Sequence, residues 1–174
     1  GPMSTSLYDA TVGTYQQILP AVEGVLDKGR AHCEENGIDL DDVIAMQLID
    51  DMLPFRFQVI SVAHHSLGAL KGVEAGVFSP PPSLDLDYAG LQGLVADARE
   101  GVAAYTREQV EGFEGDPMEF RMGSLVMPFK AEDFLLTFSL PNFYFHATTT
   151  YDMLRMKGTQ IGKRDFMGRP RLNR

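Results

Sequence analysis

The chain of 174 residues lacks several features that mark specialised protein classes. It has one cysteine and no tryptophan, so a disulfide framework and any site that needs two cysteines from one chain are excluded. It contains no run of about 18 apolar residues, so we expect no contact with a membrane. The N-terminus shows no basic segment followed by an apolar stretch, as a secretory signal would, and we therefore expect a cytoplasmic protein.

Motifs of the common enzyme classes are missing as well. The sequence has no phosphate-binding loop, no dinucleotide-binding glycine pattern, no serine-hydrolase elbow and no zincin motif. What is present is ordinary: 44% of the residues are hydrophobic and 22% are charged, which is typical of a globular domain. The length suits one domain with a core of its own.

Charge is spread unevenly along the chain. The formal net charge is -9, yet the segment from Arg155 onward holds seven basic residues and one acidic residue. An acidic body repels phosphate backbones, so we expect no nucleic-acid partner. We expect the basic tail to dock on the acidic body or on a dimer partner, or to be solvated.

Apolar periodicity predicts four long helical segments. Proline interrupts two of them: Pro54 either begins a new helix or kinks the existing one, and Pro141 should kink or restart the last helix. The predicted segments cover residues 7–36, 39–73, 85–113 and 132–157.

A short β-hairpin is expected between the third and fourth helices. Apolar and polar residues alternate over 118–122 and again over 125–129, and the turn signal Gly123-Ser124 joins them. Four helices that each carry an apolar stripe can cover one another as a bundle. We therefore predict an all-α four-helix bundle with one hairpin, formed by residues 3–168. The basic tail is 169–174, and residues 1–2 resemble the remnant of a cleaved expression tag.

Histidines are the side chains that suggest chemistry. His64 is in line with the apolar positions of its helix and should face inward, whereas His65 should be peripheral. His146 and Asn142 share one face of the last helix, one turn apart. His32 lies at the edge of the apolar stripe of the first helix.

Two interpretations of these inward polar residues stay open. Buried polar groups need partners, so the histidines and Asn142 can form a hydrogen-bond network without chemistry. A neutral imidazole is also an acid or base near neutral pH and a common metal ligand. Nearby acids or phenols that can support a histidine are Asp50, Asp51, Asp152, Tyr144 and Tyr151. We discount a Cys33–His32 nucleophile because adjacent helical residues point apart.

Several short segments carry a resemblance to a known family. They are residues 6–9, 51–54 with Gln58, 140–149, and Tyr151 with 154–155, 158 and 162–166. Over residues 7–168 the chain resembles a bacterial and fungal family known only as a domain of unknown function. That family is similar to the DinB-like superfamily of four-helix bundles, which agrees with the fold expected from periodicity.

The resemblance implies a metal site that this chain has altered. The superfamily often carries one histidine on helix two and two histidines four residues apart on helix four. The corresponding positions here are His64, Asn142 and His146, and asparagine is a weak ligand for the metals that imidazole favours. Either His32 completes a zinc or nickel site with His64 and His146, or the site has become metal-free.

Three functions follow as hypotheses. The first is a metal-independent isomerase, cyclase or lyase that acts on a small, largely apolar molecule, with catalytic His64, His146 and His32 and no cofactor. In it Asn142 orients the substrate, and one of the two phenols, Tyr144 or Tyr151, donates a proton. The second is a zinc- or nickel-dependent hydrolase or transferase. The third is a non-catalytic small-molecule binder or interaction module. Members of such families commonly pair, so we also expect a homodimer.

Overall fold

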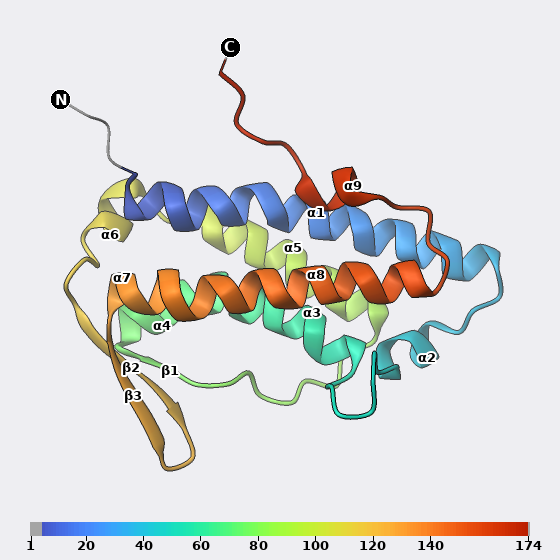
Figure 1. The fold of residues 1–174 in the computed structure, drawn as a ribbon, viewed down its shortest axis with the longest axis horizontal. Coiled ribbons are helices and arrows are strands. Elements are labelled where there is room, and N and C mark those ends of the chain that lie inside the picture. Colours follow the sequence, from blue (N-terminus) through green and yellow to red (C-terminus); the bar gives the residue numbers. More distant parts are fainter. Residues whose placement is uncertain (1–4, 174) are drawn as a thin grey trace.

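The computed structural model describes residues 5–173, so the tag remnant predicted at residues 1–2 lies outside the described part. Figure 1 shows a bundle of long helices with a hairpin at one end. The helical elements are α1 (Leu7–Glu35), α2 (Leu40–Ala45), α3 (Phe55–His64), α4 (Leu67–Ala75), α5 (Tyr88–Ala103), α6 (Arg107–Glu111), α7 (Ala131–Asp133), the π-helix η1 (Phe134–Ser139), α8 (Leu140–Met156) and α9 (Lys163–Met167). The strands are β1 (Val77–Phe78), β2 (Pro117–Met122) and β3 (Leu125–Lys130).

The four long segments of the bundle are α1, α3, α5 and α8, which confirms the predicted all-α architecture. Helix α1 begins at a cap in which the Ser6 hydroxyl accepts the Asp9 backbone N–H at 3.0 Å, and it ends within one residue of the predicted position. Between the helices lies one continuous core of buried apolar side chains. Its largest fully buried members include Tyr15, Phe55, Tyr88, Phe134 and Phe143.

The second predicted segment is broken more often than expected. Helix α2 ends at Ala45, and α3 starts directly after Pro54, so the proline begins a new helix. The single helix expected over 55–73 is interrupted between α3 and α4. At the break the Ser66 hydroxyl donates to the Val62 carbonyl oxygen at 2.8 Å, which satisfies a carbonyl that the helix no longer uses.

The third segment is also two helices rather than one. Helix α5 ends at Ala103, and α6 starts after Thr106, which forms a capping box with Gln109. The threonine hydroxyl accepts the Gln109 backbone N–H, and the glutamine side chain accepts the Thr106 N–H. This reciprocal cap favours a new start over continuation of the helix.

The fourth segment runs without a break in the ribbon from α7 through η1 to α8 (Figure 1). Pro141 sits in the first turn of α8, directly after the π-helix. Proline supplies no backbone N–H, and the wider turn before it changes the rotational position of Ser139 relative to the rest of α8. In place of the predicted kink or restart at Pro141, the structure has a π-helix directly before α8.

The hairpin forms as predicted, and a third strand joins it. Strands β2 and β3 pair antiparallel through the turn at Gly123, which adopts φ +59°. Strand β1 pairs in parallel with β2, in the stretch between the second and third predicted helical segments. The added strand places Phe78 against Phe120 and Phe134, with ring centroids 6.3 Å and 5.1 Å away. These two aromatic contacts cover the apolar core at this end of the bundle.

The basic C-terminal segment lies along α1. Lys28 of α1 pairs with Asp165 of α9 at 2.7 Å, and the Gln17 amide donates to the Met167 carbonyl oxygen at 2.9 Å. Farther along the tail, the Arg171 guanidinium covers Gly13. The part of the segment around α9 thus packs on α1, whereas residues 169–173 are exposed and lead away from the bundle (Figure 1). Among the helices of residues 5–173, none is long and apolar enough to cross a membrane.

Candidate functional site

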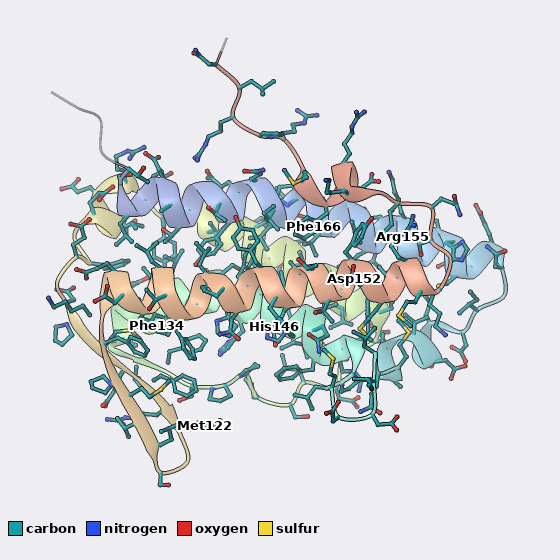
Figure 2. All side chains as sticks on the ribbon, viewed as in Figure 1. Met122, Phe134, His146, Asp152, Arg155 and Phe166 are labelled. Atoms are coloured by element: carbon teal, nitrogen blue, oxygen red, sulfur yellow. The ribbon has the colours of Figure 1, made fainter. Side chains whose placement is uncertain are left out.

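A row of polar side chains runs through the interface between α3 and α8, and we call it the polar seam. Helix α3 and its C-cap contribute Gln58, Ser61 and His65, and η1 and α8 contribute Ser139 and His146. The spacings of three, four and seven residues place each set on one helix face. Figure 2 shows His146 at the edge of α8 that faces α3. All of these residues except His146 are buried.

His146 is held in one tautomer by Gln58. The Gln58 amide nitrogen donates to the Leu53 carbonyl oxygen at 3.0 Å, which leaves the amide oxygen as an acceptor. That oxygen lies 2.7 Å from His146 Nδ1, so Nδ1 carries the proton. The lone pair of the neutral imidazole is therefore on Nε2.

His65 pairs with Ser139 across the seam. The Nδ1 atom of His65 lies 3.0 Å from the Ser139 hydroxyl oxygen, and both side chains are buried. The bond joins two irregular points of the backbone, since His65 caps α3 at the break and Ser139 ends the π-helix. The imidazoles of His65 and His146 lie nearly parallel, with centroids 6.1 Å apart and planes 11° apart.

Both seam histidines are uncharged near neutral pH. Burial lowers the pKa of His65 to about 3, and the neighbouring His64 and His146 add to this effect. Burial also lowers the pKa of His146 to about 4. Desolvation disfavours the imidazolium form in both cases.

Two hydroxyls next to the seam have no hydrogen-bond partner within residues 5–173, those of Tyr15 and Ser61. Ser61 lies between Gln58 and His65 on the same face of α3. Burial raises the pKa of Tyr15, and the nearby Ser139 hydroxyl offsets part of the rise. Buried hydroxyls are paired in most proteins, so these two are unusual features of this interface.

The predicted roles of His64 and His65 are reversed in the structure. His65 is the inward residue that faces His146, whereas His64 is half-buried on the other side of α3 and lies 2.6 Å from the Ser79 carbonyl oxygen. The prediction was wrong because α3 is covered on nearly all sides. The apolar stripe through Ile60 and Leu67 faces the segment 79–86 instead of α8.

His32 does not join the seam. Its Nε2 atom lies 2.7 Å from the Lys157 carbonyl oxygen at the end of α8, and its Nδ1 atom lies 3.3 Å from the Asn36 amide nitrogen. Eleven residues, or about 16 Å of helix, separate Lys157 from His146. In these contacts His32 ties the end of α8 to α1.

The other predicted site residues lie beside the seam or outside it. Asn142 is half-buried, and its amide donates to the Phe138 carbonyl oxygen of the same helical segment at 2.9 Å. Tyr144 is exposed. Tyr151 packs edge-on against Phe166, with centroids 6.1 Å apart.

The seam does not fit the three-ligand metal site that the family resemblance implies. Within residues 5–173, no three His, Cys, Asp or Glu side chains come close enough together to hold a metal ion. The seam offers two imidazoles, and one nitrogen of each is already hydrogen-bonded. The predicted acidic supports Asp50, Asp51 and Asp152 are exposed.

A cavity of about 340 Å³ lies between the start of α3 and the segment 79–86. Its lining includes Leu53, whose carbonyl oxygen orients Gln58, and Phe57. The Phe57 ring contacts the His146 ring edge-on at a centroid distance of 5.8 Å. Phe57 therefore separates the cavity from the seam.

Part of this site was visible in the sequence. Gln58, Ser61 and His65 follow a three-and-four spacing on an otherwise apolar helix, and Ser139, Asn142 and His146 repeat that spacing. Pairing the polar residues of α3 with those of η1 and α8 by this common spacing points to His65 and Ser139. Tyr15 lies near the seam because α1 packs beside it, and no local sequence pattern indicates this.

Comparisons with known proteins agree with this geometry. The family model described as "Domain of unknown function (DUF1993)" matches residues 7–167. A crystal structure of a DinB family member protein from Shewanella denitrificans is similar, with a TM-score of 0.78 and 21% sequence identity over 97% of this chain and 95% of that chain. At this identity the likeness concerns the fold alone. No curated protein matches the sequence.

Proposed function

The chain belongs to the DUF1993 family, a domain of unknown function, and it shares the fold of a DinB family member; from its seam we propose a metal-independent enzyme. In this proposal an isomerase, cyclase or lyase acts on a small, largely apolar molecule. His146 moves a proton, and His65 and Ser139 support it. His65 takes the place that the sequence pattern assigned to His64.

The observation that carries the proposal is the fixed tautomer of His146. Gln58 holds the Nδ1 proton at 2.7 Å, so the Nε2 lone pair is available to take a proton from a bound molecule. Burial lowers the pKa of His146 to about 4, so the neutral ring, which is the form that can accept a proton, is present near neutral pH. Such a group suits a reaction in which a proton is taken from one atom of the substrate and returned to another.

Binding of the apolar part of the substrate is assigned to the cavity of about 340 Å³ beside Phe57. A volume in this range suits a small molecule, and a mainly apolar lining with few polar groups is typical of such sites. In this arrangement a shift of the Phe57 ring brings the substrate to His146.

Deuterium exchange tests the proposal across many candidate substrates at once. The protein is incubated with a panel of small cellular metabolites in D₂O containing EDTA, and mass spectrometry detects deuterium uptake, isomers or fragments. We expect His146→Gln to lower the rate by about 10²–10⁴-fold, with His32→Gln as the matched control. Circular dichroism checks that both variants fold.

Three outcomes would overturn the proposal. Turnover by His146→Gln at the wild-type rate removes the assigned base. Turnover that EDTA abolishes and zinc or nickel restores supports the metal-dependent alternative, and binding without any turnover supports the non-catalytic one. The expected homodimer stays a prediction, which sedimentation velocity tests.

A further inference from the structure

A second cavity lies beneath an irregular segment that we call the strap, residues 79–86, and adjoins the cavity beside Phe57, with which it shares Ile60, Pro81, Pro82 and Leu84. The strap crosses α3 without regular secondary structure. Hydrogen bonds hold it near both ends: His64 Nε2 lies 2.6 Å from the Ser79 carbonyl oxygen, and Arg56 Nε donates to the Leu86 carbonyl oxygen at 2.8 Å. Between these two anchors the strap stands off the helix.

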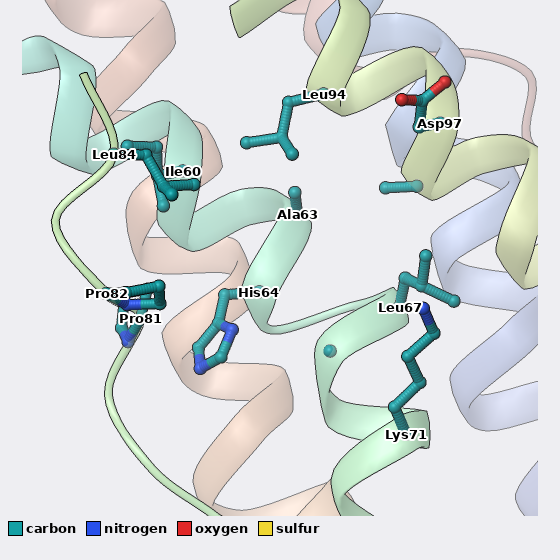
Figure 3. Close-up of a pocket in the computed structure, with 12 residues that line it drawn as sticks. Ile60, Ala63, His64, Leu67, Lys71, Pro81, Pro82, Leu84, Leu94 and Asp97 are labelled. Carbon is teal, nitrogen blue, oxygen red and sulfur yellow. The ribbon is translucent and has the colours of Figure 1, made fainter. Parts of the chain in front are cut away.

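The space under the strap is about 190 Å³ and mostly apolar. Figure 3 shows side chains from α3, α4, α5 and the strap around it. The side chains that line it include Ile60, Ala63, His64, Leu67, Leu84 and Leu94. An apolar cavity of about 150 Å³ is large enough for benzene, so this cavity has room for a molecule with one ring.

The rim of the cavity does not select an ion. Lys71 and Asp97 both lie at it, and both are exposed. One positive and one negative side chain leave no net charge at the entrance, so a neutral ligand is favoured over a charged one.

His64 gives the cavity one directed polar atom. A carbonyl oxygen only accepts hydrogen bonds, so the contact with Ser79 requires a proton on Nε2 of His64. Burial lowers the pKa of His64, although the hydrogen bond to Ser79 opposes this, and the neutral ring then has its lone pair on Nδ1. That nitrogen faces Gly68, where an added Cβ would lie 2.9 Å from it, and Gly68 lines the same cavity.

We propose that this cavity binds a neutral, single-ring apolar molecule that carries one O–H or N–H group and donates it to His64 Nδ1. The ring contacts Ile60 and Leu94 from either side. Glycine at position 68 leaves Nδ1 uncovered. This cavity adjoins the one assigned to the substrate, but its hydrogen bond to His64 involves no seam residue and does not depend on the catalytic role proposed for His146.

Phenol and toluene are matched probes for this proposal, since they are similar in size and only phenol carries a donor. Titration of each into the full chain is followed by the NMR shifts of the Ala63 and Leu94 methyl groups. We expect phenol to shift both methyl groups. Ala63→Leu fills the cavity and should abolish binding of both probes, whereas Ala31→Leu, on the exposed face of α1, should not change it.

His64→Gln tests the hydrogen bond itself. The glutamine amide can still donate to the Ser79 carbonyl oxygen and so retain the strap, while the Nδ1 acceptor is lost. The ratio of phenol affinity to toluene affinity should fall about five- to tenfold, as loss of one hydrogen bond predicts. An unchanged ratio, or phenol shifts at sites remote from the cavity only, would overturn the proposal. Neither outcome bears on turnover at His146.

Discussion

Acidification from pH 7 to pH 5 should destabilise this protein mainly through the two seam histidines. Burial holds the pKa of His65 at about 3 and that of His146 at about 4, against 6.5 for an ordinary histidine. Above pH 6.5 neither the folded nor the unfolded state binds the protons, so the full stability is present. As the pH falls below 6.5, the unfolded chain takes up protons that the folded chain refuses, and stability is lost until the folded pKa values are reached.

The linkage relation sets the size of the effect. Between pH 7 and pH 5 each of these histidines contributes a loss of about 2 kcal/mol in the free energy of unfolding, so together they account for about 4 kcal/mol. The lowered pKa of His64 acts in the same direction. The lowered pKa values of Asp9 and Asp165 start from 3.8 and therefore act only below this range.

Urea unfolding followed by circular dichroism at pH 5, 6, 7 and 8 measures this dependence. His65→Asn keeps a polar atom near Nδ1 for Ser139 and removes the titrating ring, so it should lose about 2 kcal/mol less than the wild type between pH 7 and pH 5. Between pH 7 and pH 8 the two curves should be parallel, which serves as the internal control. Equal losses from pH 7 to pH 5 in both proteins would refute the reasoning.

Four further changes have predictable results. Gly29→Ala should destabilise the protein by about 1–3 kcal/mol in urea unfolding, because the new Cβ would lie 2.9 Å from the Tyr88 hydroxyl. Gly24→Ala in the same helix meets no atom within 4 Å and should stabilise by about 0.5–1 kcal/mol. Gln58→Glu should raise the pKa of His146, as measured by NMR titration, since a carboxylate favours the imidazolium. Tyr88→Phe loses a buried hydrogen bond of 2.7 Å to a carbonyl of α1 and should cost about 1 kcal/mol.

The helical content and the hairpin could be predicted because both depend on local sequence. Apolar periodicity over α1 and α8 marks their buried faces, and the alternation around Gly123 marks two strands and their turn. Breaks in the helices were missed where side chains compete with the backbone. Ser66 bonds back to Val62, and Thr106 forms a reciprocal cap. These are short-range effects that an apolar stripe does not show.

The polar seam was only half predictable. His146 was correctly placed on an inward face of α8, because the stripe of that helix has one buried side. The choice between His64 and His65 depended on which face of α3 meets α8. Since the strap covers the opposite face of α3, both faces look apolar in the sequence, and periodicity alone selected the wrong histidine.

By itself the sequence determined the fold class, because each long helix has a buried stripe that must be covered and four such stripes cover one another. It also determined that few inward polar groups are available for chemistry. Tertiary structure decided which of them meet: the π-helix before Pro141 turns Ser139 toward His65, and packing of α3 on α8 brings Gln58 to His146. Contacts between residues 74 to 88 positions apart depend on how the helices rotate and pack, which no local pattern encodes.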